Sequence, residues 1–403
     1  MDGFEGHRRG ESGYRRASLA MFAAGVATFA GLYTTQPLLP LLSRRLHVGP
    51  GASTLTLALT TAALAVSLLP AGWLSDRWGR VRTMTAALVL SAALGELAAL
   101  APSFAVLLVV RALQGAALAG VPAVGMTYLS EEIDSGSLGA SIGLYIGGNA
   151  LGGMAGRVIA GVLADLYGWR VAIAGVGLVS VLCAGLFWRI VPPSRRQGAS
   201  ETTPRAALAA IAVHLRDRGQ RRLDMMAALL MGTFVAVYNA LGFRLHGPPY
   251  RLSEAAIASV FLVYPLGSAS SAVAGRLADR VGRRRVLPAG VLVALAGVAV
   301  TALHPLALVI TGVALLTVGF FAAHSVAAGW VGRRAASAPA QASALYLLAY
   351  YVGSSIGGPL GGVSWTVDGW TGVSVLAGGL LVGALLVSLA LRATPPLLAP
   401  APA

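Results

Sequence analysis

Only a few ionisable side chains lie well inside the long apolar stretches of this 403-residue chain, and these could do chemistry. Arg111, Arg157, Glu96 and His324 are each embedded in apolar sequence. A charge in hydrocarbon is costly, so such residues mark ion or substrate pathways when the stretch spans a membrane. A histidine, with a pKa of ~6.5, can exchange protons near neutral pH. We expect His324 to carry a coupling proton, with Arg111 or Arg157 disfavouring its charged form, and Glu96 as the alternative carrier.

Each of these residues also has a structural interpretation that the sequence leaves open. A lone histidine often serves packing alone, and Glu96 could lie at a peripheral helix interface. Arg111 is only about two turns from the start of its apolar stretch, so it could donate to carbonyl groups of neighbouring helices.

A charged loop occurs twice in the chain. GWLSDRWGRVR, at 72–82, recurs 203 residues later as GRLADRVGRRR, at 275–285, with seven of eleven positions identical. A repeat offset by half the chain indicates two homologous halves. The aspartates can accept hydrogen bonds from helix amino termini, and the arginines can join them, although the arginines could instead only fix topology. We expect a gate built from Gly72, Asp76, Arg77, Gly79, Arg80, Gly275, Asp279, Arg280, Gly282 and Arg283.

This repeated loop resembles the inner-loop signature of the major facilitator superfamily, over essentially the whole chain. A second family motif, RxxQG, occurs as Arg111, Gln114 and Gly115. Segments such as YTTQPLLPLL at 33–42 and FFAAHSVAAGWVGRRA at 320–335 are similar to the YnfM-like, arabinose-efflux-like branch. Membership implies export of poorly defined substrates. The GPxxGG motif of drug antiporters is absent from the fifth apolar stretch, which argues against a direct assignment to multidrug antiport.

Composition indicates a polytopic membrane protein. Hydrophobic residues make up 56% of the chain and charged residues 11%, too few for the surface of a soluble protein. The net charge of +15 is spread over loops, so nucleic acid is not an expected partner. The single Cys183 rules out an internal disulfide. No nucleotide-binding, hydrolase or metal-ligand motif occurs, so we expect no enzyme activity, cofactor or metal.

The elements that must position these residues are apolar spans long enough to cross a bilayer. We expect an all-α fold of twelve transmembrane helices in two six-helix halves, 1–191 and 223–403, joined by a cytoplasmic linker at 192–222. The expected spans are 17–42, 53–72, 81–101, 104–128, 138–163, 169–191, 223–243, 254–275, 286–303, 305–331, 341–363 and 370–391. Leu208, Ile211, Ala212 and Leu215 share one face, so the linker holds either a surface helix or an extension of the seventh span.

Arginines set the expected orientation. With the amino terminus inside, 23 arginines fall on the cytoplasmic side and five outside, so both termini are expected in the cytoplasm of a bacterial-type inner membrane. The first span is longer than a signal-peptide core and is expected to be retained.

The family architecture places spans 1, 4, 5, 7 and 11 around a central cavity, which implies the cargo contacts. Their polar or aromatic members are Tyr33, Gln36, Gln114, Asn149, Tyr238, Asn239 and Tyr350. Small residues let helices pack closely, and we expect this of Gly143, Gly147, Gly152, Gly156, Gly357 and Gly361.

These features favour a monomeric, proton-driven exporter of a small, partly apolar organic compound that works by alternating access. Fold alone does not fix direction, so an uptake symporter or facilitator stays open, as does a lipid flippase.

Overall fold

The computed structural model describes residues 6–194, 204–335 and 338–394. Within these ranges the regular structure is helical, apart from one isolated β-bridge between His7 and Ile133. Lipid offers no hydrogen-bond partners, and a helix satisfies its backbone groups internally, which explains this uniformity. The fold is therefore all-α, as the sequence predicts.

Ten described helices are long and apolar enough to cross a membrane. The last of them, α16 (Pro339–Arg392), contains two spans because its backbone leaves helical geometry at Asp368 and Gly369. A further span is split into α6 (Phe104–Leu118) and α7 (Gly125–Glu132). In the described part of the chain, these features together give the twelve expected spans.

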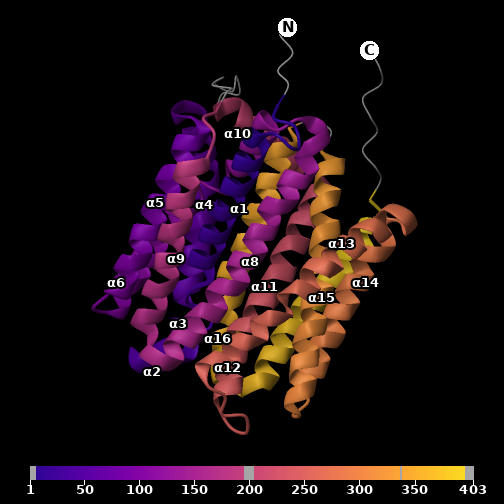
Figure 1. Ribbon diagram of the computed structural model, residues 1–403. Helices are drawn as coiled ribbons and strands as arrows, with labels where there is room; N and C mark the ends of the chain where they lie inside the picture. The colour runs from indigo at the N-terminus through magenta and orange to yellow at the C-terminus, as the bar shows by residue number, and fades with distance from the viewer. Residues whose placement is uncertain (1–5, 195–203, 336–337, 395–403) are drawn as a thin grey trace. The chain divides into compact units, whose positions relative to one another are not determined.

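The chain divides into two compact units. Unit 1 comprises Met1–Val48, Leu55–Glu201 and Leu252–Phe261. Within it, α1 packs along α8, and α4 packs along α6 (Figure 1). Its helices are α1 (Ser12–Tyr33), α2 (Leu39–Arg45), α4 (Leu55–Trp78), α5 (Arg80–Ala99), α6, α7, α8 (Ser135–Tyr167), α9 (Trp169–Ile190) and α12 (Glu254–Ser259).

Unit 2 comprises Gly49–Thr54, Thr202–Arg251 and Leu262–Ala403. Here α11 packs along α16, and α14 along α15 (Figure 1). Its helices are α3 (Pro50–Ser53), α10 (Pro204–Arg216), α11 (Arg218–His246), α13 (Tyr264–Val281), α14 (Arg283–Thr301), α15 (Leu306–Arg334) and α16; a short 3₁₀ turn, η1 (Val260–Val263), joins α12 to α13.

Each unit includes a short segment from the other half of the sequence. Residues 49–54, which precede α4, cluster with unit 2, and residues 252–261, which precede α13, cluster with unit 1. The segments occupy matching positions in the two repeats, at the start of the second and eighth spans. In unit 1 the added segment is fixed by an ion pair between Arg44 and Glu254 (2.8 Å). The expected half boundaries at 191 and 223 remain a prediction.

Two expected spans are interrupted by non-helical turns. The first was expected to run unbroken over 17–42, but α1 ends at Tyr33 and a turn leads to α2. The fourth, expected over 104–128, breaks after Leu118. Pro37 and Pro122 lie in the two breaks, and proline has no N–H to continue a helix and constrains the residue before it. Hydropathy alone did not register these breaks because both segments are apolar.

The linker ends in a separate helix, α10, and is not a continuation of the seventh span. Asp217 separates α10 from α11, and its carboxylate accepts hydrogen bonds from the N–H groups of Gly219 and Gln220 at the start of α11. Arg334 donates two hydrogen bonds to the same carboxylate (2.6 and 2.7 Å). These contacts, chiefly that with Arg334, lower the pKa of Asp217 to about 2. Asp217 is thus a charged cap that ties α11 to α15.

Candidate functional site

Arg111 on α6 is buried and braces three helices of unit 1. It donates hydrogen bonds to the carbonyl oxygens of Gly31 (2.9 Å), Leu32 (2.7 Å) and Thr56 (3.2 Å), which lie on α1 and α4. It also donates to Gln114 Oε1 (2.5 Å), and the Gln114 amide donates onward to the carbonyl of Ser91 on α5 (3.0 Å). The RxxQG motif therefore has the carbonyl-bonding geometry that the sequence left open. The roles of Arg111 in coupling and of Gln114 in cargo binding stay predictions.

The break after α1 brings Tyr33 and Gln36 to Arg157 on α8. Arg157 donates from Nε to Gln36 Oε1 (2.6 Å) and from Nη1 to the Gly153 carbonyl (2.6 Å). Its guanidinium lies 3.9 Å from the centre of the Tyr33 ring and 4.9 Å from that of Phe261. We call Tyr33, Gln36, Arg157 and Phe261 the Arg157 cluster. All four side chains belong to unit 1, and sequence reasoning missed only Phe261, which enters with residues 252–261.

Small residues allow α1 and α8 to approach closely. A Cβ added at Gly152 or Gly156 would meet the backbone of Val26 or Ala30 on α1. Gly147 differs, because no heavy atom of the described chain lies within 4 Å of such a Cβ, and the same holds for Gly143. The next residue along, Gly148, makes the contact instead, which a count of glycine intervals did not single out.

Asn149 belongs to this same α1–α8 contact. Its Oδ1 faces Gly25 on α1, where an added Cβ would collide with it. Within the described chain this buried oxygen accepts no hydrogen bond. The residue is half-buried and its proposed contact with cargo stays a prediction.

His324 lies half-buried on α15, among aromatic rings of unit 2. Its Nδ1 is 3.0 Å from the hydroxyl of Tyr346 on α16, and that hydroxyl is also 3.3 Å from the His324 carbonyl oxygen. The imidazole stacks on Phe320 at 5.7 Å and lies 4.8 Å from the Tyr350 ring. We call these four residues the His324 cluster. Phe320 and Tyr346 were not singled out from the sequence, since aromatic residues in a span are more often packing.

The other proposed cargo residues of unit 2 adjoin this cluster. Tyr238 on α11 shares a hydrogen bond with Thr317 (2.7 Å), and its neighbour Phe234 stacks on Phe320 at 4.1 Å. Asn239 is buried against Gly358 of α16. The structure therefore links Tyr238 to Tyr350 through aromatic rings within unit 2.

A carboxylate that sequence reasoning passed over lies near the His324 cluster. Asp224, at the start of α11, accepts a hydrogen bond from Gln220 (2.7 Å), which also donates to the Ala342 carbonyl (3.2 Å). Through Gln220, Asp224 is thus linked to the first turn of α16, about one turn before Tyr346. Asp224 lies two residues after Arg222, at the polar end of the span, where the charged residues were interpreted as setting topology.

Glu96, the alternative proton carrier, lies elsewhere. It is half-buried on α5 of unit 1, and its carboxylate lies against Gly177 on α9. Glu96 therefore lies at the interface between α5 and α9, as its structural interpretation expects.

The first repeat loop forms an ion-pair network in unit 1. Gly79 has a φ of +93°, a conformation that glycine adopts readily, and it separates α4 from α5. Arg80, the first residue of α5, pairs with Asp76, donates to Ser75 (2.7 Å) and pairs with Glu131 on α7 (3.1 Å). The sequence motif did not reveal Glu131, although the acidic run of Glu131, Glu132 and Asp134 in a short loop between apolar spans was the available signal.

The second repeat loop has the same backbone but a different charge balance. Gly282 has a φ of +92° and separates α13 from α14. Asp279 pairs with Arg283 (3.1 Å) and with Arg333 (3.1 Å), and its side chain is 58% exposed, against 29% for Asp76. In unit 1 one arginine, Arg80, pairs with two acids, whereas in unit 2 one acid, Asp279, pairs with two arginines. Gly72 and Gly275 make no close helix contact, because an added Cβ at either position meets no heavy atom of the described chain within 4 Å.

The Arg157 cluster presents a guanidinium and the His324 cluster presents an imidazole. Each group lies inside one helical unit and faces aromatic rings. Such groups bind polar or charged parts of small molecules and exchange protons. Among the described residues no group of three His, Cys, Asp or Glu side chains could hold a metal ion.

Comparison with known proteins gives the family. The model of the Major Facilitator Superfamily matches residues 21–254 and 223–403. The chain is 42% identical over 382 residues to the uncharacterized MFS-type transporter YybF of Bacillus subtilis, covering 95% of this chain and 94% of that one. It is 44% identical over 380 residues to the inner membrane transport protein YnfM of Escherichia coli, covering 94% and 91%.

Solved structures agree on the fold. A bacterial homologue of the human lysosomal transporter Spinster, in an inward-facing and unoccupied conformation, superposes with a TM-score of 0.74 at 15% identity, covering 95% of each chain. This chain belongs to the major facilitator superfamily and is a multi-pass membrane transporter of the YnfM-like group.

Proposed function

We propose that this transporter exports a small organic compound in exchange for protons by alternating access. The observation that carries the proposal is the pair of contacts between His324 and Tyr346. An imidazole inside a span, with two hydrogen-bond acceptors arranged around one tyrosine hydroxyl, can gain and lose a proton without leaving a buried group unsatisfied.

The chemistry of the pair follows from its geometry. When Nδ1 carries no proton, the Tyr346 hydroxyl donates to it. When the imidazole is protonated, Nδ1–H becomes the donor, and the same hydroxyl accepts from it and can donate to the His324 carbonyl. Rotation of one hydroxyl thus accommodates both charge states. Asp224, linked through Gln220 to Ala342 about one turn before Tyr346, is the second site that we propose on a proton route through unit 2.

The Arg157 cluster is the proposed cargo contact in unit 1. Arg157 has a guanidinium flanked by the rings of Tyr33 and Phe261, so it suits a compound with a polar or anionic group attached to an apolar body. In unit 2, the residues that we propose as cargo contacts are Tyr238, Asn239 and Tyr350. The networks of Asp76 and Asp279 would stabilise one access state without touching cargo.

The sign of proton movement tests the proposal and separates its rivals. The purified protein is placed in liposomes loaded with a pH-sensitive dye, and uncharged candidate compounds are added outside. Antiport predicts that the lumen becomes more alkaline, because a proton leaves as the compound enters. An uptake symporter would acidify the lumen. A facilitator or a lipid flippase would leave the lumen pH unchanged while a labelled compound or lipid still crossed.

Candidate compounds can first be found by thermal shift of the purified protein. A ligand at one hundred times its dissociation constant stabilises the folded state by ~2.7 kcal/mol. Protein-free liposomes control for passive permeation, and acidification with every transported compound would refute antiport.

A further inference from the structure

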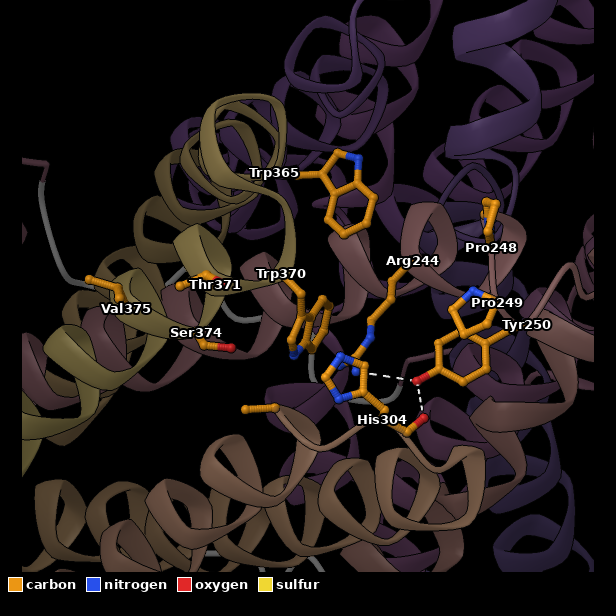
Figure 2. Close-up of a pocket in the computed structure, with 12 residues that line it drawn as sticks. Arg244, Pro248, Pro249, Tyr250, His304, Trp365, Trp370, Thr371, Ser374 and Val375 are labelled. Carbon is orange, nitrogen blue, oxygen red and sulfur yellow. Dashed lines mark hydrogen bonds between the residues drawn. The ribbon is translucent and has the colours of Figure 1, made fainter.

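A cavity of about 610 Å³ lies within unit 2, at the ends of the helices opposite the repeat loop. It is framed by the segment after α11, by the turn between α14 and α15, and by α16 around its kink. Figure 2 shows the Arg244 side chain extending between Trp370 and Tyr250. A volume of this size suits a small organic ligand.

Among the residues that line the cavity, Arg244 is the one with a permanent charge, and it is only 7% exposed. It donates hydrogen bonds to the carbonyl oxygens of Thr301 and Leu303 (2.9 Å for Leu303) and to the Tyr250 hydroxyl (3.3 Å). Its guanidinium lies 4.5 Å from the centre of the Trp370 ring. These three bonds use three of the five N–H groups of the guanidinium.

The charge of Arg244 is not balanced by an acid. In the described ranges no carboxylate forms an ion pair with it, and the residues lining the cavity include His304 but neither Asp nor Glu. A buried charge without a counter-ion is costly. Ser374 also lines the cavity, but its hydroxyl oxygen is buried away from the open space.

We propose that this cavity binds an organic anion. The carboxylate or phosphate oxygens of the ligand bond to Arg244, while its apolar body lies against Trp365, Trp370 and Pro249. Tryptophans at helix ends also favour the headgroup layer of a membrane, which accounts for the two indoles. It does not account for the absence of an acid beside Arg244 among the described residues that line the cavity.

The site is separate from the residues proposed for cargo and coupling, and it goes beyond the proposed function. The arginine-based orientation predicts that it opens on the outer face. Two sources can supply the same chemistry, namely a soluble aromatic acid or the headgroup of an anionic lipid.

Binding of 2-naphthoate to the purified full-length chain in a neutral detergent tests the proposal, by calorimetry or tryptophan fluorescence. The uncharged analogue 2-naphthalenemethanol is the comparison ligand. We expect naphthoate to bind more tightly than the alcohol, and Arg244→Gln to weaken naphthoate binding roughly tenfold or more, as for the loss of a charge-assisted hydrogen bond. Binding of the alcohol should change little.

Two further variants keep the test decisive if Arg244→Gln folds poorly. Ser374→Leu fills the cavity without touching Arg244 and should abolish binding of both ligands. Arg170→Gln is the matched control, because Arg170 also lies over a tryptophan (4.2 Å from the Trp169 ring) and bonds a carbonyl (Ala101, 2.9 Å), but it is exposed and outside the cavity. It should bind naphthoate like the native protein.

Lipid nanodiscs distinguish the two sources. If phosphatidylglycerol nanodiscs suppress naphthoate binding relative to phosphatidylcholine nanodiscs, the anion is a lipid headgroup; equal binding in both assigns the site to a soluble anion. Equal affinity for naphthoate and the alcohol, or unchanged naphthoate binding in both Arg244→Gln and Ser374→Leu, would overturn the proposal. Because these assays measure binding and not transport, their result is independent of the direction of proton movement.

Discussion

At the scale of single residues, two buried arginines of unit 1 have different surroundings. Arg111 bonds three backbone carbonyls and Gln114, whereas Arg157 bonds one carbonyl and one side chain and faces two aromatic rings. Sequence reasoning found both because charges inside apolar spans are rare. It could not assign Arg111 to a brace, because the carbonyl groups that it bonds come from distant parts of the chain.

Removing the Arg111 brace should cost mainly stability. We predict that Arg111→Gln lowers the free energy of unfolding by on the order of 3 kcal/mol, since buried carbonyl groups on α1 and α4 lose a charged donor. Thermal unfolding of the detergent-solubilised protein measures the loss. Arg170→Gln, at an exposed position, should cost less than about 1 kcal/mol. If the two variants were equally stable, the proposed structural role of Arg111 would be wrong.

At the scale of helices, close packing depends on which glycines face a neighbour. The sequence predicted a glycine stripe on the fifth span, and Gly152 and Gly156 do face α1. It could not separate them from Gly143 and Gly147, because the intervals between glycines fix a spacing but not the direction of the neighbouring helix. Pro37 and Pro122 are signals in the sequence for the two breaks. A long hydropathy window averages over such short segments and so did not indicate them.

A pair of alanine substitutions tests this packing. We predict that Gly152→Ala destabilises the protein by about 1–3 kcal/mol, because its Cβ would meet the backbone of Val26. Gly147→Ala should be neutral, or stabilising by up to about 1 kcal/mol, since alanine is the better helix former. Unfolding midpoints of the two variants decide the matter, and a larger cost for Gly147→Ala would contradict the described α1–α8 contact.

The loop networks belong to the same scale. We predict that Asp76→Asn and Glu131→Gln each slow turnover roughly tenfold while substrate affinity stays nearly native, because both acids hold Arg80 and would stabilise one access state. Asp279→Asn should be milder, since Asp279 is more exposed and pairs at the surface. Initial transport rates over a range of substrate concentrations separate the two effects. Native turnover in Asp76→Asn would exclude the gate.

At the scale of the whole molecule, the repeat at 72–82 and 275–285 correctly predicted the family, and hydropathy predicted its twelve spans. The sequence did not predict that residues 49–54 and 252–261 would cluster with the opposite unit, because short segments at span ends carry no signal for their partners. Residues 195–203 of the expected linker lie outside the described residues.

Splitting the chain between Ala199 and Arg205 tests the two-half organisation. We predict that coexpressed halves restore transport, because the linker supplies only a tether. Either half alone should be unstable, since each compact unit lacks its added segment. Transport assays and protease resistance of the separate and coexpressed halves give the answer. Complete loss of transport despite insertion of both halves would contradict a simple linker.

Proton coupling through His324 is the central claim, and one comparison tests it most directly. Native protein, His324→Gln and Glu96→Gln are placed in liposomes, and accumulation of a confirmed substrate under an imposed pH gradient is measured beside its equilibrium exchange. The account predicts that His324→Gln abolishes accumulation but retains exchange, because exchange requires the access motion and no net proton transfer. Glu96→Gln should retain both. Normal accumulation by His324→Gln, with loss in Glu96→Gln, would contradict the account and assign coupling to Glu96.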